Sequence, residues 1–167
     1  MIGIKNQKKM KRLFFLLSLI FINTFIMAKE IKTEITIRAT PEKIWTILTD
    51  FENYPNWNPF ISSIEGNVIK GNKIKVSINP PGGKKMIFKP TVTTKTPEKE
   101  LSWFGKLLFK GLFDGEHRFQ LIDNKNGTVT FVQSEKFKGL LVWMFNPTKT
   151  EKGFRQMNEK LKELAEV

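Results

Sequence analysis

The stretch TPEKIWTILTDFENYPNWNPF, residues 40–60, decides the fold of this chain. It begins as a helix, because Thr40 can cap the first turn and Pro41 stands where a helix needs no backbone N–H. Apolar side chains then follow the i, i+3, i+4, i+7 spacing of one helical stripe, namely Ile44, Ile47, Leu48 and Phe51. The prolines at 55 and 59 end the helix, because the residue before a proline disfavours helical backbone. We therefore expect a helix from Pro41 to Asp50, followed by an aromatic turn.

Outside this stretch, apolar and polar residues alternate as they do in strands. Strands are expected at residues 31–38, 61–69, 73–78, 86–95, 101–104, 113–122 and 128–136. The turn at residues 124–127, Asn-Lys-Asn-Gly, predicts a hairpin between the last two. A final helix is expected from Thr148 to Glu166, with one apolar side made by Phe154, Met157, Leu161 and Leu164. Because a sheet must bury its apolar face, the sheet is expected to pack on this helix.

This order of elements resembles the START-like superfamily, also called SRPBCC or Bet v 1-like, and within it the polyketide cyclase/dehydrase and lipid-transport group. The resemblance rests on the first strand, on the proline-started helix with Trp45, and on the turn Tyr54-Pro55-Asn56-Trp57-Asn58-Pro59-Phe60. It continues through LSWFGKLLFKGLFDGEHRFQL and GTVTFVQSEKFKGLL to the last helix. The resemblance implies an α+β helix-grip fold, in which a curved antiparallel sheet wraps around a long C-terminal helix with a cavity between them.

Residues 1–28 have the organisation of a secretory signal peptide. Basic residues precede an apolar run from Leu13 to Met27, and Ala28 is a small residue at which cleavage can occur. Met10 is an equally good start of translation. The alternative is an uncleaved anchor in the inner membrane, although the run is shorter than the roughly 20 residues needed to span a bilayer. We expect residues 29–167 to form one START-like/SRPBCC domain that is periplasmic or secreted.

The composition excludes several chemistries. The chain has no cysteine and one histidine, which leaves no disulfides, no thiol catalysis and no zinc or iron site of the usual composition. The formal net charge of +12 falls to about +7 without the basic leader, and the remaining lysines form short separate groups. That distribution does not predict a nucleic-acid interface. We expect no cofactor, no metal and a monomer.

Strand alternation turns His117 and Glu135 toward the predicted cavity. A turn centred on Asn126 places these two residues opposite each other, and a shift of two places His117 opposite Gln133 instead. The pair could act as acid and base or anchor a ligand, with Glu135 holding the imidazole tautomer. The alternative is a structural pair that bridges two strands. The candidate ligand-binding residues are those expected to face the cavity, namely Val76, Phe88, Trp103, His117, Phe119, Phe131, Gln133 and Glu135.

Two further segments, residues 103–113 and 139–145, are unusually apolar. Each could be an ordinary covered loop, or part of a cavity mouth whose apolar tip touches a ligand or a bilayer with lysines at headgroup level. The candidate mouth residues are Leu107, Leu108, Phe109, Leu141 and Trp143. The strand that follows the first segment begins with Asp114 and Glu116, whose outward parity predicts solvated charges.

Three functions remain open from the sequence. The first is an exported protein that binds or transports a hydrophobic, lipid-like or polycyclic molecule in its cavity. The second is an enzyme resembling the polyketide cyclases and dehydratases, which would use His117 or Glu135 on a bound aromatic or polyketide-like substrate. The third is a module that contacts a protein or, transiently, a membrane.

Overall fold

The structure is a computed structural model that describes residues 27–167. Its strands are β1 (Met27–Ile37), β2 (Ile61–Glu65), β3 (Lys75–Ile78), β4 (Met86–Phe88), β5 (Thr91–Thr96), β6 (Glu100–Lys106), β7 (Asp114–Asp123) and β8 (Val129–Gly139). Its helices are α2 (Pro41–Thr49), the single turn α3 (Tyr54–Trp57) and α4 (Thr148–Ala165), with 3-10 turns at Phe51–Asn53 and Val142–Met144. Residues 1–26 of the expected leader lie outside the described residues, whereas Met27 and Ala28 are the first residues of β1 and pair with Gly139 and Lys138. Within residues 27–167, no helix is both long enough and apolar enough to cross a bilayer.

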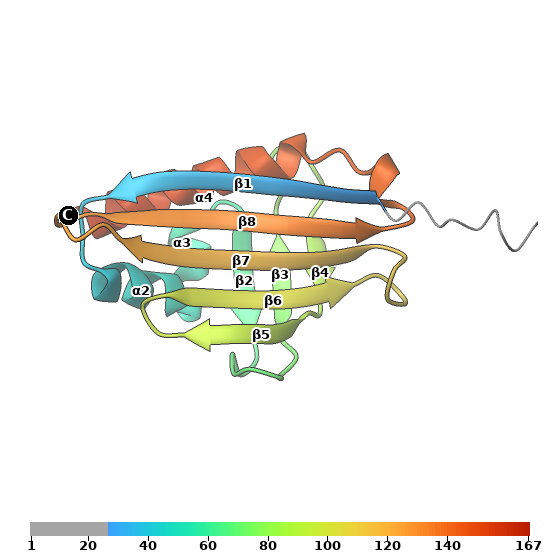
Figure 1. Ribbon diagram of the computed structural model, residues 1–167, viewed down its shortest axis with the longest axis horizontal. Helices are drawn as coiled ribbons and strands as arrows, with labels where there is room; N and C mark the ends of the chain where they lie inside the picture. The colour runs from blue at the N-terminus through green and yellow to red at the C-terminus, as the bar shows by residue number, and fades with distance from the viewer. Residues whose placement is uncertain (1–26) are drawn as a thin grey trace, which may run out of the picture.

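The strands form two antiparallel sheets. The larger has the order β1-β8-β7-β6-β5, and the smaller has the order β2-β3-β4. A single bridge between Lys73 and Thr91 links them. Helix α4 runs along one face of the larger sheet, roughly parallel to its long strands, and the smaller sheet lies on the same side (Figure 1). This arrangement confirms the expected α+β helix-grip fold.

The opening stretch folds as its sequence predicts. The Thr40 hydroxyl accepts a hydrogen bond from the Lys43 backbone N–H at 3.2 Å, which caps α2. The Asn58 side-chain oxygen accepts bonds from the backbone N–H groups of Phe60 and Ile61, at 3.0 and 2.8 Å. This bonding explains why an asparagine stands in the turn, because its short carbonyl satisfies two donors where the chain enters β2.

Three elements differ from the predictions. The strand expected at residues 61–69 ends at Glu65. The strand expected at residues 86–95 is two strands, because Pro90 has no N–H to donate and the chain bends there, so that β4 pairs with β3 and β5 pairs with β6. In α4, Leu164 is 39% exposed and Ala165 is buried in its place. At 3.6 residues per turn, position 165 lies on the same side of the helix as Leu161, whereas position 164 lies to one side. The last buried residue of α4 is therefore Ala165 and not Leu164.

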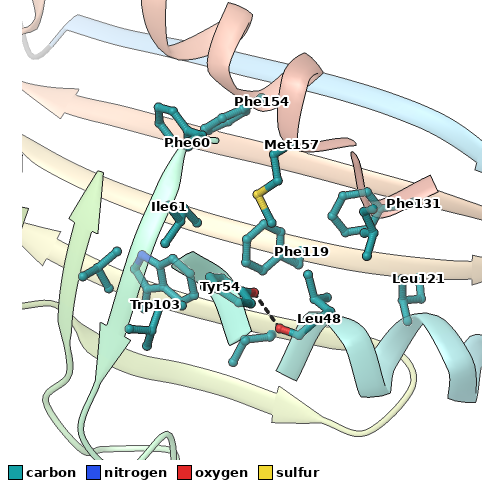
Figure 2. Close-up of a cluster of buried hydrophobic side chains, with 14 of the residues drawn as sticks. Leu48, Tyr54, Phe60, Ile61, Trp103, Phe119, Leu121, Phe131, Phe154 and Met157 are labelled. Atoms are coloured by element: carbon teal, nitrogen blue, oxygen red, sulfur yellow. Dashed lines mark hydrogen bonds between the residues drawn. The ribbon is translucent and has the colours of Figure 1, made fainter. Parts of the chain in front are cut away.

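The space between the larger sheet and α4 is occupied by large side chains. Phe119 and Phe131 rise from the sheet and stack with ring centroids 5.7 Å apart, while Phe154 and Met157 descend from α4, and all four are fully buried (Figure 2). Phe60 enters from the aromatic turn and meets Phe154 edge-on at 5.3 Å. The resemblance implies a cavity in this space, so a bound molecule there would have to displace side chains.

Candidate functional site

The hairpin of β7 and β8 has the predicted register. His117 is paired with Glu135, and Phe119 with Gln133, in one continuous ladder. His117, Phe119 and Gln133 are all buried on the face that meets α4. The register follows from the short turn, since a turn centred on Asn126 leaves only one pairing without a bulge.

Aromatic rings enclose the imidazole of His117. It lies flat on Trp103, with ring centroids 4.7 Å apart and an interplanar angle of 10°. Phe119 and Phe154 meet it edge-on, with centroids 4.6 and 5.1 Å away. The imidazole is thus packed on one face by the sheet and at its edges by the sheet and α4, which fixes its plane.

Two polar groups contact the ring nitrogens of His117. Nδ1 lies 3.4 Å from Glu135 Oε2, and Nε2 lies 3.5 Å from the Gln133 Nε2. Both contacts are long for hydrogen bonds. They are mutually consistent for a neutral imidazole, in which Nδ1–H donates to the carboxylate and Nε2 accepts from the Gln133 amide.

Glu135 connects this buried group to the surface. Its side chain is 21% exposed, while that of His117 is almost inaccessible. Gly115, on the adjacent strand, leaves the room that the carboxylate needs, because a Cβ there would lie 2.9 Å from Glu135 Oε1. The sheet therefore holds a chain of contacts from solvent through Glu135 and His117 to Gln133.

A second set of buried polar side chains continues this chain toward α4. The Asn158 Nδ2 donates to Thr33 Oγ1 at 3.0 Å, and Thr33 Oγ1 donates to the backbone oxygen of Gln133 at 3.4 Å. Gln133 Nε2 also lies 3.6 Å from the sulfur of Met157. Among the described residues, the side-chain oxygens of Gln133 and Asn158 have no hydrogen-bond partner, although both residues are fully buried. Trp57 Nε1 and Asn58 Nδ2, at the aromatic turn, are also buried without a partner, so what distinguishes the oxygens of Gln133 and Asn158 is their place on β8 and α4, inside the fold.

The structure brings most of the predicted interior residues together. Val76, Trp103, His117, Phe119, Phe131 and Gln133 are buried in one core, and Glu135 lies at its edge. The prediction for Phe88 is wrong. It is 45% exposed, because β4 is a three-residue edge strand of the smaller sheet and all three of its side chains reach solvent.

Thr33 and Asn158 were not predicted, although the sequence contains a signal for each. Thr33 has the same parity as Ile31 and Ile35, so alternation alone places it on the inner face. Asn158 lies four residues after Phe154, on the apolar side of the last helix. Thr33 and Asn158 each stand where the periodic pattern calls for an apolar residue, and that mismatch could have identified them from the sequence.

The two apolar segments form one surface. The backbone N–H groups of Leu140 and Leu141 donate to the carbonyls of Gly111 and Leu112, each at 3.0 Å, so the β6–β7 and β8–α4 connections lie side by side. Of the predicted mouth residues, Leu107, Leu108, Phe109 and Trp143 are exposed and Leu141 is half-buried.

Asp114 is not the solvated charge that its parity predicts. It is buried, and its two carboxylate oxygens accept bonds from the Gly111 N–H at 3.1 and 3.0 Å. The carboxylate turns back under the β6–β7 loop and satisfies a backbone donor there. Its role is to hold the shape of that loop.

Other sites are poorly supported within residues 27–167. No group of three or more acidic, histidine or cysteine side chains there could hold a metal ion. A hollow of about 240 Å³ lies on the outer face of the larger sheet, lined by Glu30, Lys32, Glu116, Arg118, Gln120, Val132, Ser134 and Lys136. These side chains point away from α4, and several pair with one another, as Arg118 does with Glu116 at 3.3 Å. The outer hollow is therefore a charged sheet surface and not the interior site.

Solved structures share this fold at low sequence identity. The major latex-like protein 151 of Panax ginseng matches with a TM-score of 0.67 and 12% identity over 83% of this chain and 97% of its own. Norcoclaurine synthase from Thalictrum flavum, solved with dopamine and hydroxybenzaldehyde, matches with a TM-score of 0.64 and 14% identity over 83% of this chain and 87% of its own. The di-domain ARO/CYC BexL, from the BE-7585A biosynthetic pathway, matches with a TM-score of 0.68 and 11% identity over 99% of this chain and 58% of its own.

Sequence comparison assigns the family. No curated protein sequence matches the chain significantly. One family model, described as polyketide cyclase/dehydrase and lipid transport, matches residues 28–166. That match covers nearly every residue of the fold described above, from the start of β1 to the end of α4. The chain therefore belongs to the polyketide cyclase/dehydrase and lipid transport family.

Proposed function

We propose that this protein binds and carries a hydrophobic small molecule between the larger sheet and α4. The observation that carries the proposal is the pair of buried, unpartnered oxygens on Gln133 and Asn158, inside a largely apolar core. An unpartnered buried polar atom costs about 1–3 kcal/mol. A ligand that donates hydrogen bonds to these oxygens recovers that cost.

The lining defines the class of ligand. Aromatic and aliphatic side chains surround the two oxygens, so most of the ligand surface must be apolar. The oxygens accept hydrogen bonds, so the ligand must carry one or two hydroxyl or N–H groups. A hydroxylated lipid or a phenolic polycycle has this chemistry. The aromatic compounds bound by the Thalictrum flavum enzyme support this assignment by analogy of fold.

The ligand must displace side chains that now fill the interior. Met157 is suited to this movement, because its unbranched side chain has several rotatable bonds and it covers Gln133 from α4. The route inward passes the end where Glu135 reaches solvent. Phe137 and Phe145 pack there with ring centroids 4.5 Å apart, and Lys29 Nζ donates to the Phe145 carbonyl at 2.6 Å. Lys29 Nζ also lies 3.5 Å from the Trp143 carbonyl, so release of Lys29 would loosen the segment directly before α4.

Mass spectrometry tests the proposal directly. The full chain is expressed in a bacterial host and compared under native and denaturing conditions. We expect a small-molecule adduct that disappears on denaturation and whose occupancy falls at least about tenfold in Gln133→Met, because the ligand loses a buried hydrogen bond. The exposed Gln156→Met variant is the control and keeps the adduct. A chain that stays free of adducts when it is incubated with a total lipid extract of the host would count against a carrier.

The same spectra test a second proposal, that the chain is exported. Cleavage after Ala28 would shorten the chain to residues 29–167, and the intact mass of the periplasmic fraction reports this directly. An uncleaved mass in the membrane fraction would instead support the anchored alternative.

A second function, catalysis on the bound molecule, is favoured by the contact between His117 Nδ1 and Glu135 Oε2. A carboxylate that orients a buried imidazole is an arrangement used in acid–base catalysis. Once the adduct is identified, its turnover is measured in His117→Gln and Glu135→Gln. Unchanged turnover in both variants excludes these groups as acid or base, and binding without turnover leaves the carrier function alone.

A further inference from the structure

One end of the molecule exposes an unusual amount of apolar surface. It is formed by the end of β6 with the β6–β7 loop (residues 105–113) and by the end of β8 with the β8–α4 connection (residues 139–147), where β1 begins (Figure 1). The exposed side chains of this surface, which we name the apolar end, are Leu107, Leu108, Phe109, Leu140, Trp143 and Met144. Scattered single apolar residues are normal on protein surfaces, whereas six exposed apolar residues on two hydrogen-bonded connections point to an interaction site.

The backbone is built to hold this surface together. Gly139 has φ of +141°, and a Cβ there would lie 2.5 Å from the Leu112 carbonyl oxygen, so only glycine allows the two segments to approach. The Asp114 carboxylate stabilises the β6–β7 loop by accepting a hydrogen bond from the Gly111 N–H. Leu108, at the loop tip, is 82% exposed with φ of +58°. A bulky residue held exposed in a left-handed conformation is a strain that indicates function.

A third segment adjoins the apolar end. Lys149 Nζ donates to the Gly82 carbonyl at 2.6 Å, and a Cβ on Gly105 would lie 3.6 Å from Pro90. The segment between these two anchor points carries β4, whose three apolar residues are all exposed. The exposed apolar surface therefore extends past the two loops onto the smaller sheet.

Positive charge surrounds this surface. Residues 79–90, 105–113 and 136–150 contain lysines and no aspartate or glutamate. The exposed lysines closest to the loop tips are Lys106, Lys110 and Lys138, and none of the three is in an ion pair with any of residues 27–167. An apolar tip ringed by unpaired lysines complements a surface with an apolar layer beneath a layer of negative charge.

We infer that the apolar end docks on the surface of a bilayer containing anionic phospholipid. Leu108, Phe109 and Trp143 enter the boundary between headgroups and acyl chains, while the lysines contact the phosphates above it. The entry point of the chain agrees with this orientation. Met27, the last residue of the apolar run of residues 13–27, pairs with Gly139 at this same end. Docking does not depend on the ligand proposed above, although it would place the Glu135 end of the interior close to the membrane.

Quenching of Trp143 provides the test. The full chain is mixed with vesicles of phosphatidylcholine alone, or of phosphatidylcholine and phosphatidylglycerol in equal parts, each containing spin-labelled lipid. We expect quenching of tryptophan fluorescence with the anionic vesicles, and little with the neutral ones. The quenched component is lost in Trp143→Phe, because Trp143 is 63% exposed and the other three tryptophans are half-buried or buried. Quenching that is absent, or equal for both vesicle types, overturns the inference.

Substitutions of lysines and of apolar residues separate the electrostatic contribution to vesicle binding from the apolar contribution. Each lysine near an anionic surface contributes about fivefold to binding, so Lys106→Glu/Lys110→Glu raises the half-saturating lipid concentration at least about 30-fold. Leu108→Glu abolishes quenching, because a carboxylate cannot enter the acyl boundary. The matched controls lie near the other end of the sheet, Lys95→Glu/Lys99→Glu and the exposed Ile122→Glu, and bind as the unchanged chain does.

Other occupants of the apolar end give different results. A second copy of the chain on this surface would appear as a dimer in sedimentation without vesicles, dispersed by Leu108→Glu, and would overturn the membrane assignment. Attachment only through residues 1–26 would carry the chain onto vesicles with Trp143 unquenched, and would also overturn it. Circular dichroism of each variant confirms that a loss of quenching is not a loss of folding.

Discussion

The ring of Phe60 lies directly against the backbone of Gly153, so that a Cβ on this glycine would overlap the ring. Gly153 stands in the first half of α4, where glycine costs about 1 kcal/mol relative to alanine. The close approach explains why it is there. Phe60 ends the aromatic turn and Phe154 follows the glycine, so their edge-on contact joins the fold-determining stretch to the last helix.

Gly153→Ala should therefore destabilise the protein. Overpacking against Phe60 outweighs the gain in helix propensity, and we expect a loss of about 2 kcal/mol in the free energy of unfolding by urea. The loss should shrink when Phe60→Leu is introduced first, since the smaller side chain makes room. Lys152→Ala, an exposed neighbour in the same helix, is the control. A Gly153→Ala protein more stable than the parent would show that the ring can move away at little cost.

Gln133→Met should stabilise the ligand-free protein by about 1 kcal/mol. The substitution keeps the volume, removes a buried oxygen without a partner and sacrifices only two long contacts, to His117 and to the sulfur of Met157. Urea unfolding of stripped protein provides the measurement, and Gln156→Met on the exposed side of α4 should change stability by less than about 0.5 kcal/mol. Marked destabilisation by Gln133→Met would mean that the oxygen is satisfied in the protein. If Gln133 is a binding residue, its substitution should raise the stability of the protein and abolish ligand binding.

Tyr54 should make the protein unstable at alkaline pH. Burial raises the pKa of its phenol well above the ordinary value, and its hydroxyl donates to the Leu48 carbonyl at 2.6 Å. Above a pH of about 10 the unfolded chain loses the phenolic proton while the folded chain keeps it. The free energy of unfolding then falls by about 1.4 kcal/mol per pH unit from this group, and below that pH the group contributes no pH dependence.

This titration can be followed without interference, because Tyr54 is the only tyrosine in the chain. Tyrosinate absorbance should appear together with the loss of tertiary structure and not before it. Tyr54→Phe should cost about 1 kcal/mol near neutral pH and should remove this part of the alkaline slope. Tyrosinate absorbance that rises while the near-ultraviolet circular dichroism is still native would contradict a buried phenol.

Asp114→Ala should loosen the β6–β7 loop. The carboxylate is the partner of the Gly111 N–H, and a hydrogen bond to a charged group contributes about 1.5–3 kcal/mol. We expect faster hydrogen exchange at Gly111 and its neighbours, with smaller changes in the centre of β7. Glu116→Ala, on the same strand but partly exposed, should leave exchange in the loop unchanged. Uniform acceleration across β7 would instead indicate that Asp114 stabilises the whole sheet.

Several features of the fold follow from the sequence because they are local or periodic. The helix after Thr40 depends on its cap, on Pro41 and on a stripe of four apolar residues, all within a few turns. The pairing of His117 with Glu135 depends on the length of one turn and on strand alternation. In both cases the responsible interactions join residues close in sequence, so no knowledge of distant contacts is needed.

Other features depend on contacts between distant segments, and only the tertiary structure decides them. Parity places Asp114 in solvent, yet the loop folds back over its carboxylate and buries it. Phe88 has an inward position in a long strand, but Pro90 breaks that strand and leaves it on an exposed edge. The packed interior, the polar contact of Asn158 with Thr33 and the joining of two loops at Gly139 each depend on how closely α4 and the loops approach the sheet. That distance is set by the packing of all the side chains between them, which no local pattern of residues encodes.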